Sequence, residues 1–159
     1  MQATTKQSTT EQSSQTGSRR AVWTIMFAIL MPLIIVALIL AVIGKSNALF
    51  LPLLDGFKTA SAIILSFLGG IRWGSELRNQ VIKPLILFAT IIPVAIGWIC
   101  LLLSGPLAIG LLLIAVCAMG AWDSFYWHEK ADIKWYANVR TVMTLIAAFM
   151  HSLVLLAIL

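Results

Sequence analysis

Three charged residues at the edges of apolar runs are the strongest candidates for chemistry in this sequence. Arg72 ends the uncharged run 59–71, Asp123 directly follows the uncharged run 84–122, and Arg140 precedes the uncharged run 141–159. A charge in an apolar environment is costly unless it finds a partner, and a guanidinium can bind a carboxylate through two hydrogen bonds. We therefore expect Arg72, Asp123 and Arg140 to meet, leaving one positive charge in excess. Trp73 and Tyr136 are expected beside them.

Such a cluster would suit a lipid phosphate, a carboxylate or an acidic segment of a partner protein. A second interpretation explains the same residues without a ligand. Tryptophan and tyrosine gather at the interface between membrane and water, and arginine side chains extend toward that interface from within the bilayer. Under this interpretation, Trp73 and Tyr136 belong to an aromatic belt.

A second candidate site lies deeper. His151 comes eleven residues after Arg140, which is about 16 Å along a helix. Pro32 and Pro93 stand at a similar depth, counted from the basic residues that precede their runs. Each proline leaves a backbone carbonyl without its helical partner, and an ionisable residue inside a membrane indicates function by default. The alternative is a neutral histidine, hydrogen-bonded inside the bundle, with two ordinary proline kinks.

Small residues recur every four positions around Ser66, Gly70 and Gly74. Small side chains allow helix backbones to approach closely in lipid. We expect this face to pack inside the chain's own bundle, and the alternative is association between copies of the chain.

The composition indicates which elements must position these residues. The chain has 159 residues, of which 60% are hydrophobic and only 11% are charged. Soluble domains have about 25% charged residues, so the composition excludes an ordinary soluble domain and favours an integral membrane protein. Residues 1–20 are rich in Gln, Ser and Thr and predict a disordered polar tail.

The remaining residues, 21–159, predict an all-α membrane protein with a bundle of five transmembrane helices. A spanning helix needs about 20 apolar residues, and Ser104-Gly105-Pro106 marks a turn within the longest uncharged region. The expected spans are 21–43, 57–77, 83–103, 106–125 and 137–158.

The basic residues predict the orientation. Five spans place on one side a large basic set: Lys6, Arg19, Arg20, Arg78, Lys83, Lys130, Lys134 and Arg140. The other side has Lys45 and Lys58. Because Lys and Arg accumulate on the cytoplasmic side, we expect a cytoplasmic N-terminus and an external C-terminus. The expected location is a bacterial inner membrane, or the mitochondrial inner membrane in a eukaryote.

No motif for catalysis, a cofactor or a metal is found, and the sequence favours a protein that is not an enzyme. Cys100 and Cys117 lie inside apolar runs without metal-ligand spacing. The net charge of +5 is explained by membrane topology rather than by binding of nucleic acid.

The segment from Ile64 to Gly74, with the pattern Gly-Gly-x-x-Trp-Gly, resembles the hallmark of the domain of unknown function 3429 family. Pro32, Pro93 followed by Trp98, and Trp135-Tyr136 followed by Arg140 also fit. The resemblance extends from about residue 21 to the end of the chain, and the eukaryotic relatives are called transmembrane protein 69. It implies a small polytopic membrane protein and supplies no catalytic residue.

Three functions follow from these sites. The first is an accessory, assembly or scaffold protein that docks membrane partners or anionic lipids at the cytoplasmic face. The second is a small carrier or channel that uses Pro32, Pro93 and His151. The third is a membrane enzyme acting on lipid or quinone at the cluster of Arg72, Asp123 and Arg140.

Overall fold

The long uncharged runs of the sequence form helices that pack side by side. The computed structural model describes residues 2–128 and 134–159, with side chains from residue 16 onward. Six helices occur in this part of the chain: α1 (Gln2–Ile43), α2 (Phe50–Leu77), α3 (Pro84–Ala89), α4 (Ile92–Leu102), α5 (Gly105–His128) and α6 (Lys134–Ile158). Lys130, which the charge pattern assigned to the basic side, lies outside the described residues.

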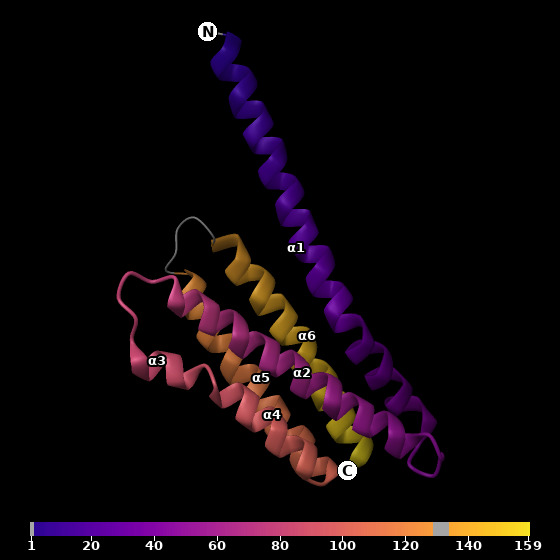
Figure 1. Cartoon of the computed structure of the whole chain (residues 1–159). Coiled ribbons are helices and arrows are strands. Elements are labelled where there is room, and N and C mark those ends of the chain that lie inside the picture. The colour runs from indigo at the N-terminus through magenta and orange to yellow at the C-terminus, as the bar shows by residue number, and fades with distance from the viewer. Residues whose placement is uncertain (1, 129–133) are drawn as a thin grey trace.

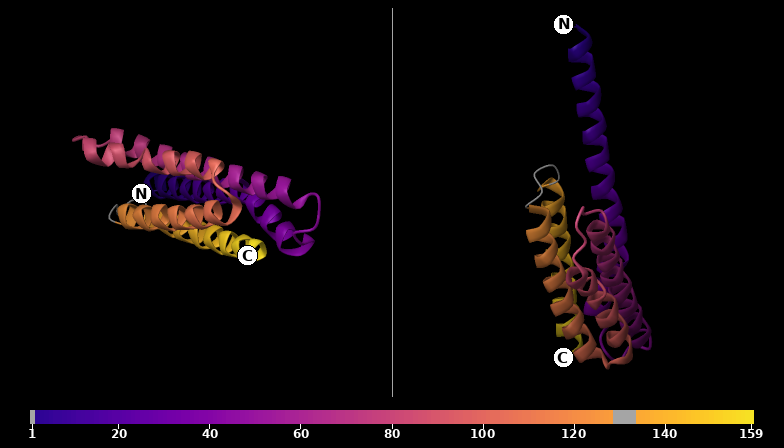
Figure 2. Two further views of the ribbon diagram at one scale, coloured as in Figure 1. Left: turned by 90° about the horizontal axis from the view of Figure 1, so that it is seen from below. Right: turned by 60° about the vertical axis from the view of Figure 1, so that its left-hand side comes forward.

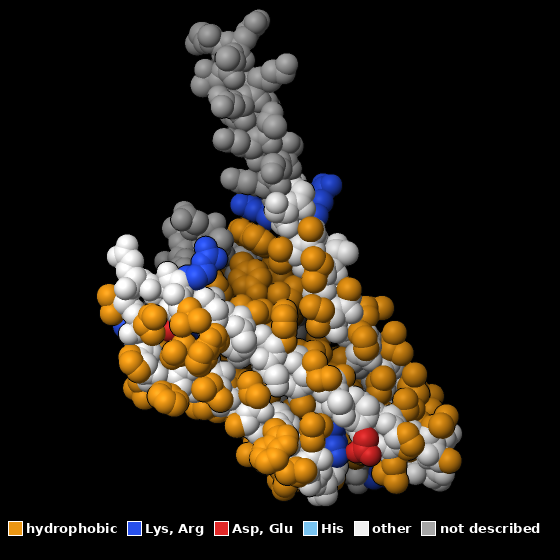
Figure 3. Space-filling view, viewed as in Figure 1, with side chains coloured by type: hydrophobic (Ala, Val, Ile, Leu, Met, Phe, Trp, Pro, Cys, Tyr) orange, Lys and Arg blue, Asp and Glu red, His pale blue; other side chains and the backbone are white. Residues whose placement is uncertain are grey.

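Five segments of the described chain are long and apolar enough to cross a membrane, as the sequence predicts. They are Thr16–Ile43, Phe50–Leu77, Pro84–Leu102, Gly105–His128 and Lys134–Ile158. The protein is thus a multi-pass membrane protein by the length and composition of its helices. Orange apolar side chains cover the visible flank of the bundle (Figure 3), which is the surface expected to face lipid.

The helices form a closed ring of neighbours. In order around the bundle these are α1, α6, α5, α4 and α2, and α2 also packs against α1 and α5. The two views of Figure 2 show α5 and α6 side by side along most of their length. Leu33 of α1, Phe57 and Leu65 of α2 and Leu112 of α5 are almost completely buried between them. In this arrangement the buried faces of α2, α5 and α6 meet.

Helix α1 extends well beyond the bundle. It is helical from Gln2, and its first part projects past the other helices (Figure 1). The structure therefore has helix at residues 2–20, where the composition predicts disorder. A helix without packed neighbours depends on its local propensity alone and is marginal in water, so the disordered tail stays a prediction to be tested in solution.

Helix α2 begins at Phe50, seven residues before its expected start. Lys58 and Asp55 form an ion pair of 3.0 Å along the helix, and Lys58 Nζ donates to the carbonyl of Leu103, 3.3 Å away. These contacts give the buried ammonium group of Lys58 an ion-pair partner and a hydrogen-bond acceptor. Asp55, which lies before the expected span 57–77, is therefore part of α2.

The third span is broken into two helices. Helix α3 ends at Ala89 and α4 begins at Ile92, with Pro93 in its first turn, a position that proline tolerates because its missing N–H would be unpaired there anyway. The carbonyl of Thr90 lies so close to Gly69 that a Cβ on that glycine would be 2.7 Å from it. Gly69 therefore lets the break pack against α2. Pro32, in contrast, lies within a continuous α1.

The prediction that Gly70 and Gly74 pack inside the bundle is wrong. Both are exposed, and a Cβ on either would have no neighbour within 4 Å. Ser66 is half-buried and donates its hydroxyl to the carbonyl of Ala62 on its own helix. The glycine that packs is Gly69, one position earlier, because the buried face of α2 is the face that bears Arg72.

Candidate functional site

Asp123 and Arg140 form a buried ion pair between α5 and α6. Nε of Arg140 donates to Oδ2 of Asp123 at 2.9 Å, and its NH2 group donates to the same oxygen. Asp123 is only 1% exposed. The two helices pack over most of their length and place both residues at the same end of the bundle.

Arg72 of α2 joins this pair from a third helix. Its Nε lies 3.6 Å from Oδ1 of Asp123. Its guanidinium lies over the ring of Tyr126, 3.6 Å from the ring centre, and beside Trp122, 4.6 Å from the ring centre. Aromatic faces attract cations, more strongly where water is excluded. The structure thus brings together the three charged residues that the sequence singled out, and we call Arg72, Asp123 and Arg140 the charge cluster.

The charge cluster is buried and has two cations for one anion. All three side chains are at most 3% exposed. Nε and NH1 of Arg72 and Oδ1 of Asp123 make no hydrogen bond to any described residue. Because Asp123 is shared by two arginines, it is poorly suited to act as a free base. The cluster can stabilise the bundle and places excess positive charge at this end.

The aromatic neighbours differ in part from those expected. Trp73 is 38% exposed on the outer side of α2, so its predicted place beside the cluster is wrong. Tyr136 is half-buried and packs edge-on against Trp127, with 5.2 Å between the ring centres. The rings that hold Arg72 are Trp122 and Tyr126. Their signal in the sequence is adjacency to Asp123 and a one-turn spacing from it.

Glu76, four residues after Arg72 on α2, has a separate structural role. Its carboxylate accepts a hydrogen bond from the side chain of Asn79 at 2.9 Å and one from the backbone N–H of Lys83 at 3.2 Å. It is buried although it lies near the end of α2. Glu76 therefore holds the connection between α2 and α3.

The deeper candidate site does not form as predicted, because its three members are separated. Pro32 is exposed on α1. Pro93 is buried against Gly69 and lines a hollow between α4 and α5. Only His151 faces a cavity between α1, α2 and α6. Side chains from different sides of the bundle cannot form one passage.

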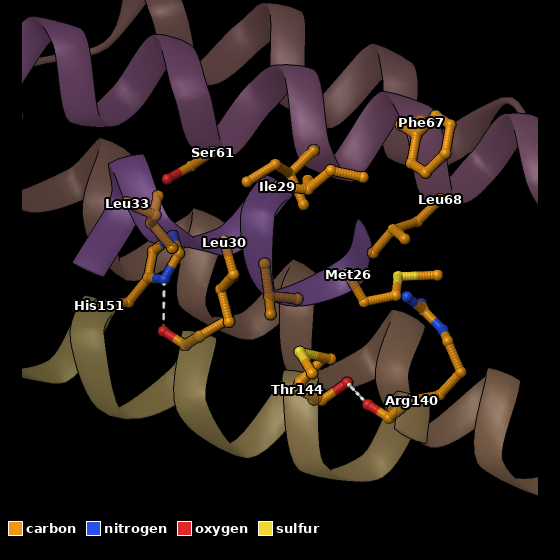
Figure 4. A pocket seen from close by; sticks show the side chains of 14 residues that line it. Met26, Ile29, Leu30, Leu33, Ser61, Phe67, Leu68, Arg140, Thr144 and His151 are labelled. Atoms are coloured by element: carbon orange, nitrogen blue, oxygen red, sulfur yellow. Dashed lines mark hydrogen bonds between the residues drawn. The ribbon is translucent and has the colours of Figure 1, made fainter. Parts of the chain in front are cut away.

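That cavity has a volume of about 40 Å³. Its walls are mainly apolar, and Figure 4 shows His151 at one end of the row of lining side chains and Arg140 at the other. Thr144 and Ser61 add hydroxyl groups, which donate to the carbonyls of Arg140 and Phe57 on their own helices.

The side chains that the structure describes, in 16–128 and 134–159, include no group of three or more His, Cys, Asp or Glu residues that could hold a metal ion. Cys100 is buried and Cys117 is exposed, and both are free thiols.

Comparison with known proteins identifies a family and no function. The family model described as "Protein of unknown function (DUF3429)" matches residues 18–156. The search of curated proteins and the search of solved structures each found no match. Since the family match includes all five apolar helices and the charge cluster, the chain belongs to the DUF3429 family.

Proposed function

We propose that the protein is an accessory protein of an inner membrane that docks anionic partners at its basic end, with anionic lipid headgroups as the first ligand class. The basic end is the end of the bundle where α2 and α5 finish and α6 begins. It has a set of exposed cationic side chains: Arg19, Arg20, Arg78, Lys83 and Lys134.

One observation carries this proposal: among the residues that the structure describes, every exposed charged side chain at the basic end is cationic. The acidic residues described there are Glu76 and Asp123, and both are buried and hydrogen-bonded. Arg19 is held by the ring of Trp135, 5.5 Å from its centre. Blue side chains lie where α1 leaves the bundle, and at the opposite end of the bundle blue lies beside a larger red patch (Figure 3). Juxtamembrane cations attract anionic lipids by about 1 kcal/mol each.

The geometry favours docking over the other two functions. A carrier built on Pro32, Pro93 and His151 would need these residues around one passage, and they lie on different sides of the bundle. An enzyme at the charge cluster would need a free acid or base, and the carboxylate of Asp123 is engaged by Arg140.

The same charges support an orientation. We propose that the basic end faces the cytoplasm, or the matrix in a mitochondrion, because Lys and Arg accumulate on that side. The N-terminus would then be cytoplasmic and the C-terminus external. Docking would take place at the leaflet that carries anionic lipid.

Thermal unfolding of the purified protein in detergent tests the ligand class. Added phosphatidylglycerol should raise the melting temperature more than phosphatidylcholine, and salt should reduce the difference because it screens exposed charges. The double variant Arg78→Gln, Lys83→Gln should lose much of the difference. The matched control is Lys45→Gln, which changes an exposed lysine at the opposite end.

Equal melting temperatures in the two lipids would refute lipid docking. If an acidic membrane protein co-purifies with the wild-type chain and is lost from the double variant, docking at the basic end is supported with a protein as the partner.

A further inference from the structure

The cavity between α1, α2 and α6 opens sideways, toward the surface expected to face lipid. Ile29 of α1 and Phe67 of α2 line it and are 36% and 49% exposed. Leu30, Leu33 and His151 line it from inside and are buried. A molecule dissolved in the membrane could therefore enter between α1 and α2 without passing through water.

His151 places a hydrogen-bond acceptor in this cavity. Its Nδ1 lies 2.7 Å from the carbonyl oxygen of Ala147. A carbonyl can only accept, so Nδ1 carries the proton, and in a neutral imidazole the other nitrogen then has a free lone pair. Nε2 is buried and makes no hydrogen bond to a described residue. The edge-on contact with Phe57, with 4.9 Å between ring centres, helps to fix the ring.

The second polar group at this end is also able to accept. The hydroxyl of Ser61 donates to the carbonyl of Phe57 at 2.8 Å, which uses its proton and leaves lone pairs. The end of the cavity near His151 thus offers acceptors within apolar walls. A buried acceptor without a donor loses the hydrogen bond that it would make to water, so a ligand that supplies a donor gains affinity here.

We propose that this cavity binds a membrane-dissolved alcohol, a neutral molecule with one hydroxyl group on a long apolar chain. The hydroxyl donates to Nε2 of His151, and the first carbons of the chain occupy the cavity. The rest of the chain leaves between Ile29 and Phe67 into the bilayer. The site is distinct from the basic end and requires neither anionic lipid nor the exposed cations.

Charge complementarity argues against an acid as the occupant. Arg140 is the cationic residue that lines the cavity, and its Nε and NH2 are already bound to Asp123. The acceptors of His151 and Ser61 would repel a carboxylate. An ether or an alkane would fill the apolar volume and leave Nε2 without a donor.

Photolabelling of the purified full-length protein tests the proposal directly. The probe is dodecanol with a diazirine in its chain, and the competitors are unlabelled dodecanol, dodecyl methyl ether and dodecanoate. We expect labelled peptides from α1, α2 and α6. Dodecanol should compete at a concentration about five-fold lower than the ether, which is the value of one net hydrogen bond.

Variants connect this preference to the imidazole. His151→Phe should abolish the preference for the alcohol, whereas His151→Gln keeps an acceptor and should retain part of it. The matched control is His128→Phe, since His128 is exposed at the end of α5, away from the cavity. The double variant Arg78→Gln, Lys83→Gln should leave the preference unchanged, which separates this site from the basic end.

Each other outcome overturns the proposal. Equal competition by alcohol and ether in the wild-type protein would mean that the cavity selects only an apolar chain. Stronger competition by dodecanoate than by dodecanol would mean that the cavity selects its ligand through the charge of Arg140. A preference that survives in folded His151→Phe would exclude the imidazole, and the competition series in the wild type decides the question even if that variant does not fold.

Discussion

Replacing Asp123 with asparagine removes the carboxylate that two buried arginines share. Two unit charges at the 3.6 Å that separates Nε of Arg72 from Oδ1 of Asp123 attract each other by about 5 kcal/mol at an effective dielectric constant of about 20, before the cost of desolvation. Removing one partner of a buried pair typically costs about 3–5 kcal/mol. Asparagine keeps one oxygen for Arg140, so we expect a loss near the lower limit, about 3 kcal/mol. That loss corresponds to a change of roughly 150-fold in the unfolding equilibrium.

Unfolding by dodecyl sulfate in mixed micelles, followed by circular dichroism, would measure this loss. The comparison variant is Asp55→Asn, which breaks an ion pair whose carboxylate is 70% exposed and whose lysine is buried. Because the exposed carboxylate of Asp55 keeps most of its hydration, we expect this variant to cost less than Asp123→Asn. If Asp123→Asn costs no more than Asp55→Asn, the charge cluster does not stabilise the fold.

A double-mutant cycle separates this effect from lost packing. Arg140→Met should cost less in the Asp123→Asn background than in the wild-type chain, because its partner has already gone. For residues in direct contact we expect a coupling energy of about 1–3 kcal/mol. Coupling near zero would show that the hydrogen bonds between Arg140 and Asp123 carry no net energy.

Three further predictions concern packing, topology and the first residues. Gly69→Ala should destabilise the protein by about 1–3 kcal/mol, because its Cβ would meet the carbonyl of Thr90, whereas Gly70→Ala should be close to neutral; equal effects would contradict the packing described for α2. Reporter fusions should be active in the cytoplasm at the N-terminus and outside at the C-terminus, and a C-terminal reporter active only in the cytoplasm would reverse the proposed orientation. Amide hydrogens of residues 2–15 should exchange with deuterium within seconds if this segment is disordered, and slow exchange would establish the helix there.

The number of spans could be predicted because an uncharged, apolar run of about 20 residues is typical of a membrane-spanning helix. The start of α2 could not, since the expected span 57–77 placed Asp55 before the helix, whereas α2 begins at Phe50 and includes that residue. The structure keeps Lys58 inside it through contacts with Asp55 and with the carbonyl of Leu103, and the latter residue is distant in sequence. The break at Thr90 depends on the close approach of Gly69, which no local pattern shows.

The charge cluster could be predicted because charge and depth leave few partners for a buried arginine. The prediction that Gly70 and Gly74 pack inside the bundle was wrong, and the geometry of a helix explains why. Gly70 and Gly74 each lie two residues from Arg72, or about 200° around the helix. They cannot face inward together with Arg72. Gly69, three residues from Arg72, shares its face, so the choice of the buried charge determines which glycine packs.

The sequence predicts the depth of His151 in the membrane but not the residues that line its cavity. The depth of the histidine follows from counting residues along one helix, but its neighbours come from α1 and α2. Those contacts depend on the angles and rotations at which the three helices pack. Pro32 and Pro93 share the depth of His151 and not its side of the bundle, and rotation about a helix axis is poorly constrained by an almost uniformly apolar surface.

The shared carboxylate also imposes an order on biosynthesis. Arg72 is translated about 50 residues before Asp123, so at synthesis rates of about 5–20 residues per second it waits several seconds without this partner. Arg140 follows 17 residues after Asp123. During that interval the nascent chain can hold α2 and α5 together through the ion pair between Arg72 and Asp123 alone. Helix α6 then brings the second arginine, so the ion-paired cluster that joins three helices is completed only after the start of α6 has been synthesised.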